Sequence, residues 1–436
     1  MDSLVFMEYA LAGLIRFWLL CSDYRQTVAD RVEVSTPLNS WKRVTEGAFL
    51  YNEGINPYDG DLFHETPLGL FVFKYMIQRL SQWLGVIFII CDLLTAHLLY
   101  RTACIYMKEL IEKQTLEKSS YAKDTQGLLL RNEDLKLSPI YVASAYLFNP
   151  YIILNCVGQT TTVFTNLCLA ATYLMMVKGQ QLPCCFALAM ATLQALYPAM
   201  LVVPASLYIA KKNTCGMSDR CSQIYSPWAT CGLFACVLFF LLYFSSQLSG
   251  SWTFLHSTYG FILNVPDLRP NIGLFWYFFT EMFEHFRPLF ICAFQINAAF
   301  LYLVPLTLRL HEEPMLLATS LTALTAIFKS YPCLGDVGFY LALLPMWKHL
   351  FNYMQQGFVV SCFFIITSVL GPIVWHLWIY SRSANANFYF GVTLAFATAQ
   401  IFLVTDILFA YIKREFSLHF GLQREVNGKA AKLVLE

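Results

Sequence analysis

Apolar residues are arranged along the chain in long runs separated by shorter polar segments. A bilayer core of about 30 Å needs roughly 20 apolar residues in an α-helix, or fewer where a span is irregular. The candidate spans are 4–21, 83–104, 138–156, 161–177, 183–197, 198–210, 227–247, 288–308, 315–329, 336–350, 357–380 and 388–411. The pattern predicts an all-α polytopic membrane protein with about twelve transmembrane helices, forming a single membrane domain over residues 1–436.

The apolar run over residues 183–210 is the most difficult to divide into spans. Pro198 and Pro204 interrupt it, and a proline in a helix interior removes a hydrogen bond and clashes with the preceding turn. We interpret the run as a tight hairpin of two short helices, although the pattern alone leaves one tilted span open.

The lysine and arginine residues indicate the orientation, because cytosolic loops of membrane proteins are enriched in both. The predicted cytosolic loop over 105–137, together with the end of the preceding span, is rich in these cations: Arg101, Lys108, Lys113, Lys118, Lys123, Arg131 and Lys136. With twelve spans, both termini and the tail 412–436 are also cytosolic. The long loop 23–82 and the loop 248–287 then face the lumen.

The second luminal loop contains an aromatic segment with three ionisable residues, Glu281, Glu284 and His285. Carboxylates near the bilayer centre are costly, so residues 273–286 are predicted to form a helix lying at the luminal membrane surface. Glu281 and His285 would share one face of that helix at i, i+4 spacing. Together with Trp276 they would form the luminal interface.

The composition agrees with a membrane protein that has no strongly charged partner. Charged residues make up 13% of the chain, whereas soluble domains contain about 25%. The net charge of +1 gives no indication of nucleic-acid binding. The 14 cysteines include no CxxC pair, so neither a disulfide framework nor a zinc site is expected.

Few residues suggest catalysis or metal binding. Asp59-Gly60-Asp61 has the DxD pattern in which glycosyltransferase carboxylates hold a divalent cation, but two acids around one glycine also fit a turn. Asp92 and Asp406 lie inside predicted spans, where ionisable residues face the bundle interior. A ligand contact or a hydrogen bond between helices would explain either aspartate. We expect no catalytic residue, metal or cofactor in this chain.

Two predicted luminal turns are candidate ligand sites. Residues 329–336 (KSYPCLGD) combine helix-breaking residues, free backbone amides and one charge of each sign. This combination suits an anionic lipid headgroup, or else Lys329 extends along an ordinary turn towards the membrane surface. In the turn over 383–387, Asn385 and Asn387 would hydrogen-bond to sugar hydroxyls or cap the helix that follows.

Taken together, several segments closely resemble the U subunit of GPI transamidase, the PIG-U family. They are WKRVTEG (41–47), FHETPL (63–68), CDLLTAHLLY (91–100), LFNPYIILNC (147–156), VPDLRPNIGLFWYFFTEMFEHF (265–286), FKSYPCLGD (328–336) and WHLWIYSRSANANF (375–388). The resemblance implies a subunit of the endoplasmic-reticulum complex that removes a C-terminal signal peptide and attaches a preformed GPI glycolipid. It also implies that the nucleophilic cysteine belongs to another, caspase-like subunit.

A wider resemblance connects the chain to the GPI mannosyltransferases that use dolichol-phosphate-mannose, and it implies a glycosyltransferase-C-like fold. The shared positions are Asn56-Pro57-Tyr58, Thr66-Pro67-Leu68, Asp92, Asn149-Pro150, Asp267, Arg269 and Asn271. The enzymes carry an Asp-x-Asp-like pair early in the first luminal loop, where this chain has only Asp30 and Glu33. Residues 155–166 also lack the charges that the enzymes carry there. These losses suggest a former glycosyltransferase pocket that now binds a glycolipid.

The leading hypothesis is a non-catalytic subunit in the endoplasmic-reticulum membrane that binds the GPI glycolipid and presents it to the other transamidase subunits. The hypothetical lipid contacts are Asp267, Arg269, Asn271, Lys329, Ser330, Tyr331, Asp336, Asn385 and Asn387. Two alternatives stay open. One is an active mannosyltransferase with Asp30, Glu33 or Asp59 as an indispensable acid, and the other is a scaffold subunit without lipid contact.

Overall fold

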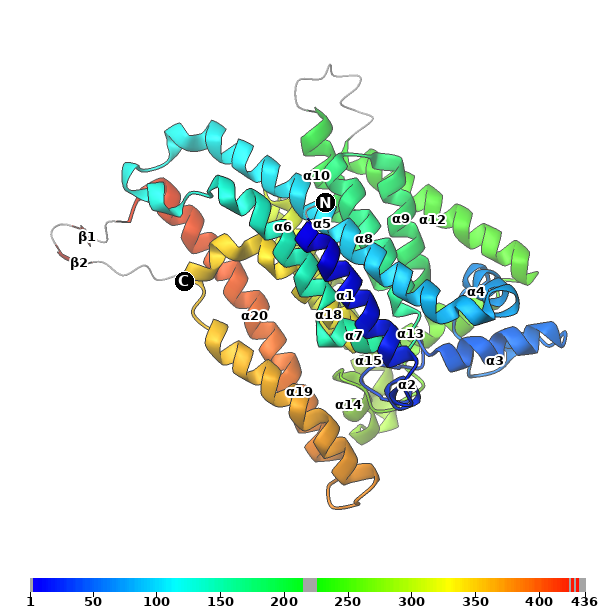
Figure 1. The fold of residues 1–436 in the computed structure, drawn as a ribbon. Helices are drawn as coiled ribbons and strands as arrows, with labels where there is room; N and C mark the ends of the chain where they lie inside the picture. The colour runs from blue at the N-terminus through cyan, green and yellow to red at the C-terminus, as the bar shows by residue number, and fades with distance from the viewer. Residues whose placement is uncertain (1–2, 215–225, 423–424, 427–428, 431–436) are drawn as a thin grey trace.

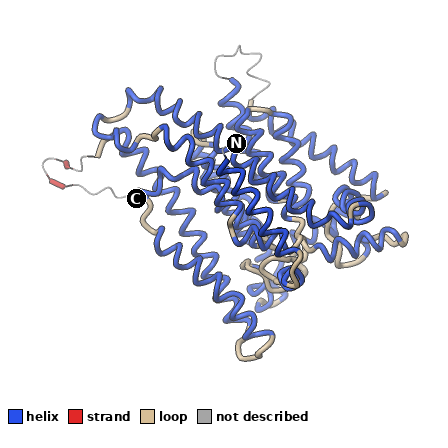
Figure 2. The backbone as a smooth tube through the Cα atoms, viewed as in Figure 1, coloured by secondary structure: helices blue, strands red, loops and turns tan. Residues whose placement is uncertain are grey.

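The computed structural model describes residues 3–214, 226–422, 425–426 and 429–430, and its described part is almost entirely helical (Figures 1 and 2). The first half contains α1 (Ser3–Leu20), α2 (Tyr24–Ala29), α3 (Trp41–Asn52), α4 (Pro67–Arg79), α5 (Leu84–Glu117), α6 (Asn132–Leu147), α7 (Pro150–Val157), α8 (Thr162–Lys178), α9 (Gln181–Ala195) and α10 (Val202–Thr214). The second half contains α12 (Pro227–Ser249), α13 (Phe261–Asn264), α14 (Phe275–Glu281), α15 (Arg287–Ile296), α16 (Leu303–Leu310), α17 (Pro314–Phe328), α18 (Leu334–Leu343), α19 (Gly357–Ile379) and α20 (Ala386–Phe420). Two strands of two residues each, β1 (Glu425–Val426) and β2 (Lys429–Ala430), pair antiparallel near the C-terminus.

The core of the bundle is formed by α5, α6, α8, α9, α17 and α18, which pack against one another. α17 is buried on nearly all sides because its residues are apolar or small all round, as expected for a helix enclosed by other helices. α19 and α20 form a long hairpin at one edge of the bundle (Figure 1). α3 and α4 lie at one end of the bundle, while the last turns of α5 and α10 lie at the other end (Figure 1).

Five helical stretches of the described chain are long and apolar enough to cross a membrane: 81–120, 227–249, 284–310, 357–379 and 386–420. A sixth is possible if 123–147 and 150–157, which meet at a bend of 46°, form one span. Each of the twelve predicted stretches contains a helix, but several of these helices are short. The described part of the protein is therefore almost entirely helical, with five or six helices of spanning length. Twelve spans, a glycosyltransferase-C-like fold and the orientation stay predictions.

The run over 183–210 consists of two helices, which agrees with the hairpin interpretation. α9 ends at Ala195, and Leu196 has a positive φ of 59°. At the far end, the Asn213 side-chain amide donates a hydrogen bond to the Gly179 carbonyl at 2.6 Å, so the end of α10 lies beside the start of α9. Pro204 falls in the first turn of α10, where a missing N–H costs little.

The prediction of a single surface helix over 273–286 is wrong. α14 ends at Glu281, Met282 is extended with ψ 142°, and a separate 3₁₀ turn covers Glu284–Phe286 before α15. Glu281 and His285 therefore do not share a helical face, although both are exposed.

The same prediction placed Trp276 at the luminal interface, whereas it is 3% exposed. Trp276 packs against Trp378, Tyr389 and Phe390. Because burial of a large aromatic side chain is strongly favourable, α14 is held against the α19–α20 hairpin. The start of α15 is held elsewhere, since Arg287 donates to the Val265 carbonyl at 2.9 Å. The two anchors explain the break between the helices.

Two helices extend further than predicted from the apolar pattern. α5 continues to Glu117, inside the predicted loop 105–137, and α20 continues to Phe420, inside the predicted tail 412–436. The two extensions are connected, because the Ala122 amide donates to the Leu418 carbonyl at 2.9 Å. Part of the predicted tail lies outside the described residues. The predicted luminal loop 23–82 contains three helices, α2, α3 and α4.

Candidate functional site

The loop over residues 329–336, which joins α17 to α18, is a buried connection point for distant parts of the chain. Ser330 is fully buried, and its hydroxyl donates to the Ile262 carbonyl at 2.8 Å and lies 2.7 Å from the Tyr197 hydroxyl. Tyr331 donates its hydroxyl hydrogen to the Asp267 carbonyl at 3.0 Å. Predicted contacts from two sequence segments, 265–271 and 329–336, therefore lie together.

Lys329 and Asp336 form an ion pair within this loop, with Nζ and Oδ2 2.6 Å apart. Asp336 also accepts a hydrogen bond from the Cys333 amide at 2.9 Å, which caps the start of α18. Both side chains are about 15% exposed. A ligand charge would therefore have to displace an existing pair, so the structure gives these two residues a clear role in holding the loop.

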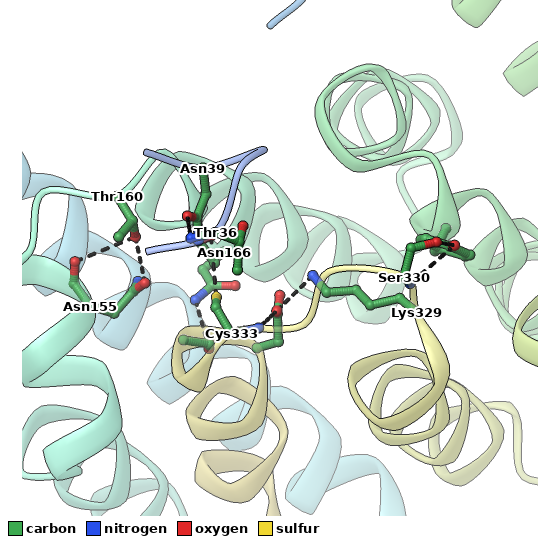
Figure 3. A network of polar contacts seen from close by, with 12 residues as sticks. Thr36, Asn39, Asn155, Thr160, Asn166, Lys329, Ser330 and Cys333 are labelled. Carbon is green, nitrogen blue, oxygen red and sulfur yellow. Dashed lines mark hydrogen bonds and ion pairs between the residues drawn. The ribbon is translucent and has the colours of Figure 1, made fainter. Parts of the chain in front are cut away.

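Uncharged polar residues connect this loop to the segment 36–39, which was predicted to be luminal (Figure 3). The Asn39 side-chain amide donates to the Thr162 hydroxyl at 3.0 Å, and its oxygen accepts from the Thr36 backbone amide at 2.7 Å. The Asn166 side-chain amide donates to the Gly335 carbonyl at 3.2 Å. None of these residues was among the predicted contacts, although small polar side chains between apolar runs are a signal for such packing.

The segment 267–273 is fixed at Asp267 and Asn271 and free at Arg269. Asp267 pairs with Arg43 of α3 at 3.0 Å, and the Asn271 side chain accepts from the Gly273 amide at 2.7 Å. Arg269 is exposed, and its guanidinium makes no hydrogen bond or ion pair with the described part of the chain. Of the three, Arg269 is the one available to a ligand.

An apolar groove of about 210 Å³, here called the hairpin groove, separates the α19–α20 hairpin from α7. Its walls include Leu154, Ile272, Leu334, Pro372, Val392 and Phe396. The lining also includes Arg31 and Glu33, which are joined by hydrogen bonds of 2.8 and 3.0 Å. Tyr389 donates to Glu33 at 3.1 Å. The groove thus combines mostly apolar walls with one charged cluster.

A second hollow of about 480 Å³ has several polar residues in its lining and lies beside the start of the 267–273 segment. It is here called the luminal cavity, because the segments that line it are predicted to face the lumen. It is lined by Asp61, His64, His256, Asn264 and Asp267 among others. Asp267 lines the cavity and Ile272 lines the hairpin groove. Even a fully extended chain between them would place their Cα atoms at most about 18 Å apart. Arg269 lies between these two lining residues in the sequence.

Burial controls the ionisation of two neighbouring residues near the luminal cavity. Burial lowers the pKa of His64 to about 4. Its Nδ1 lies 2.8 Å from the Ser257 carbonyl, and its ring stacks on Phe261. A neutral His64 must carry its proton on Nδ1 to make that bond. Burial also raises the pKa of Glu65 to about 7, with Thr161 as its hydrogen-bond partner.

Asn385 and Asn387 lie apart from the 329–336 loop, at the turn of the α19–α20 hairpin that was predicted to be luminal. The Asn385 side chain accepts from the amides of Asn387 and Phe388 at 3.1 and 3.3 Å, so it caps α20 as one of the two predictions stated. Asn387 accepts from the Tyr277 hydroxyl. Tyr389, two residues further on, lines the hairpin groove and donates to Glu33, so this turn leads into the groove wall.

Asp92 and Asp406 are both engaged in contacts within the protein. Asp92 pairs with Arg16 and accepts from Tyr146. Asp406 accepts from the amides of Gln355 and Gln356 at 2.8 to 3.1 Å, at the start of α19. These contacts agree with the hydrogen-bonding alternative. Among the described residues, no group of three metal-binding side chains lies close enough to hold an ion.

Comparison with known proteins gives consistent matches over most of the chain. The family model described as GPI transamidase subunit PIG-U matches residues 10–396. The GPI-anchor transamidase component PIGU of Homo sapiens is 42% identical over 431 residues, which cover 98% of each chain. The GPI transamidase component GAB1 of Saccharomyces cerevisiae is 28% identical over 400 residues and 91% of each chain.

Proposed function

Because the chain belongs to the PIG-U family and is therefore a subunit of the GPI transamidase complex, we propose that it holds the GPI glycolipid for transfer. The lipid portion occupies the hairpin groove, and the glycan extends over Arg269 towards the luminal cavity. The chain is a multi-pass protein of the endoplasmic-reticulum membrane with both termini in the cytosol, and it presents the glycolipid to a catalytic, caspase-like subunit.

The observation that carries this proposal is the chemistry of the hairpin groove. Its walls are mostly apolar, and they include the Arg31–Glu33 ion pair. A ligand site of this kind favours a molecule with an apolar body and a few fixed polar groups. Arg31 donates to Glu33 through Nε and Nη2, so among the described residues its Nη1 keeps both hydrogens for a phosphate oxygen. A glycolipid with acyl chains next to a phosphate has this distribution.

The arrangement of the luminal residues supports a place for the glycan. Sugar hydroxyls require donors and acceptors, which Asp61, His256 and Asn264 supply in the luminal cavity. Arg269 is exposed and stands in the sequence between Asp267, which lines this cavity, and Ile272, which lines the hairpin groove. A guanidinium without a side-chain partner among the described residues would bind a phosphate on the glycan. Asn385 and Asn387 come shortly before Tyr389, which lines the groove.

Asp30 and Glu33 are acidic residues in the first part of the predicted luminal loop 23–82. Their contacts favour a chain that presents the lipid over one that transfers mannose. Asp30 is paired with Lys42 and accepts from Gln26 at 2.7 Å. Glu33 accepts hydrogen bonds from Arg31 and Tyr389. A general base must reach the acceptor hydroxyl with a free lone pair, and both carboxylates already serve neighbours. This favours a non-catalytic role for the chain.

A matched pair of substitutions tests the hairpin groove. Ser368 lines the groove and Ser361 does not, yet both are exposed on α19 and both donate to the carbonyl four residues earlier. Ser368→Trp and Ser361→Trp add the same bulk to the same helix. The readout is photo-crosslinking of a GPI analogue to the assembled transamidase, with subunit recovery as the measure of assembly.

We expect Ser368→Trp to remove most of the adduct on this chain, whereas Ser361→Trp keeps it and both variants assemble. Equal adducts in the two variants would exclude the groove as the lipid site. Absence of any adduct on the unmodified chain would favour the scaffold alternative.

A further inference from the structure

A third hollow, of about 210 Å³, lies between α5, α10 and the turn before α17. It is at the opposite end of the bundle from the luminal cavity (Figure 1). Its lining carries equal numbers of cations and anions: Lys113, Lys211, Lys212, Glu109, Glu312 and Glu313. From its geometry we propose that this cavity, here called the basal cavity, binds the headgroup of a zwitterionic phospholipid, with a phosphate and a primary ammonium. The proposal is independent of the glycolipid site.

Some of these charges stabilise the walls and others stay available. Lys113 pairs with Glu313, and Lys212 pairs with Glu109, which also accepts from Tyr208. Lys211 makes only one hydrogen bond among the described residues, to the Glu312 backbone carbonyl at 2.7 Å. An ammonium has three donors, so Lys211 keeps two for a ligand. The Glu312 carboxylate beside it is 76% exposed.

Tyr106 provides an independent indication of a ligand. Its side chain is 4% exposed and lines the basal cavity. Its hydroxyl has no hydrogen-bond partner in the described part of the chain, although Glu109, Tyr208 and Glu313 line the same cavity. A buried hydroxyl without a partner is costly. A phosphate oxygen held by Lys211 would accept the missing hydrogen bond.

The balance of charge selects the class of headgroup. Basic pockets between helices on the cytosolic side bind anionic headgroups, but here three glutamates offset three lysines. A purely anionic group would face the carboxylates of Glu312 and Glu313. A headgroup with both signs satisfies the two sets together, with its phosphate towards Lys211 and Tyr106 and its ammonium towards Glu312. The basal cavity is larger than several water molecules, each of which occupies about 30 Å³, so a headgroup has room there.

The surroundings of the basal cavity favour a lipid over a soluble ester. α16 ends at Leu310, just before Glu312 and Glu313, and it exposes Val304 (61%) and Leu308 (73%). This apolar surface leads along α16 to the cavity. Acyl chains lying along α16 would place the attached headgroup at the cavity, whereas a soluble phosphoester would gain nothing from that surface.

The test measures binding of dihexanoyl phosphatidylethanolamine to the purified full-length chain in detergent by isothermal titration calorimetry. We expect saturable binding that Tyr106→Phe and Lys211→Met each weaken about tenfold, the effect of losing a hydrogen bond to a charged group. Tyr353→Phe is the matched control, because Tyr353 also has an unpartnered buried hydroxyl but does not line the basal cavity. It should leave the affinity unchanged.

Tyr106→Phe removes no hydrogen bond within the described chain, so the variant should fold normally. Glu312→Gln should abolish the preference for phosphatidylethanolamine over phosphatidylcholine, whose ammonium cannot donate. Tyr106→Phe binding as tightly as the unmodified chain would overturn the site, as would the absence of saturable binding. Tighter binding of dihexanoyl phosphatidic acid would overturn the zwitterionic assignment. Equal affinity for glycerophosphoethanolamine would overturn the lipid assignment.

Discussion

Arg16 of α1 and Asp92 of α5 form a fully buried ion pair, with Nε and Oδ2 2.6 Å apart. Tyr146 of α6 donates to the second carboxylate oxygen at 2.9 Å, and Arg16 also donates to the Leu147 carbonyl at 2.9 Å. Three helices thus meet at one polar point. Asp92 therefore holds helices together, and the hairpin groove and the luminal cavity do not include it.

Removing one member of this pair should destabilise the protein more than removing both. Asp92→Leu leaves a buried guanidinium without its counter-charge, and the expected loss is about 3–5 kcal/mol. Arg16→Met together with Asp92→Leu should recover much of that loss. The measurement is the thermal unfolding midpoint of the purified chain in detergent. A double variant as unstable as the single one would mean that packing, rather than charge, determines the cost.

His64 and Glu65 should give opposite pH dependences of stability. Glu65 has a folded pKa of about 7 against an ordinary 4.5, so the folded state binds more protons and stability falls as the pH rises between these values. His64 has a folded pKa of about 4 against 6.5, so stability rises with pH over that interval. Each slope is about 1.4 kcal/mol per pH unit, and the two nearly cancel from pH 4.5 to 6.5.

Replacing one of the two residues should reveal the pH dependence of stability that the other one produces. In that pH interval Glu65→Gln leaves a stability that rises with pH, and His64→Gln leaves one that falls. Unfolding midpoints at half-unit pH steps measure both. Parallel profiles in the two variants would show that these residues do not dominate the titration.

Arg269 should contribute to glycolipid use without contributing to the fold. Arg269→Gln removes an exposed cation that has no side-chain partner in the described chain, so assembly should be unchanged. Loss of a charge-assisted contact to phosphate should lower GPI attachment about tenfold. Arg79→Gln is the control, since Arg79 is an exposed arginine at the end of α4 that lines neither the groove nor the luminal cavity. Attachment is measured as surface display of a GPI-anchored reporter; equal display in the two variants would remove Arg269 from the proposed site.

The lipids that accumulate without this chain separate presentation from mannosyl transfer. Cells that lack it should accumulate complete GPI with its ethanolamine-phosphate cap, together with uncleaved precursor proteins, because the transfer step is blocked. Labelling with radioactive mannose and separating the lipids gives the answer. A lipid that lacks a mannose would instead identify an active transferase, and alanine substitutions at Asp30, Glu33 and Asp59 would then locate its base.

Local features of the fold could be predicted from the residues themselves. The apolar runs became helices because burying or immersing an apolar stretch requires its backbone to be hydrogen-bonded internally. Helix starts also depend on nearby residues. Thr66 accepts from the Gly69 amide at 3.3 Å, and Asn149 accepts from the Tyr151 amide at 3.0 Å; each of these capping residues directly precedes a proline. The two-helix interpretation of 183–210 also depended on nearby prolines.

Contacts between distant residues could not be predicted in this way. Glu33 contacts Tyr389, which lies 356 positions further along the chain, and no property of either residue selects the other. The helical spacing of Glu281 and His285 was overridden because Trp276 is buried against the hairpin and Arg287 against Val265.

The sequence by itself determined a helical membrane protein of the PIG-U family and the set of polar residues that interrupt its apolar runs. Only the tertiary structure decided which of those residues are used within the protein, such as Lys329 with Asp336, and which have no side-chain partner among the described residues, such as Arg269. The physical reason is that a local pattern determines backbone hydrogen bonding, whereas the partner of a charge depends on how the whole bundle packs.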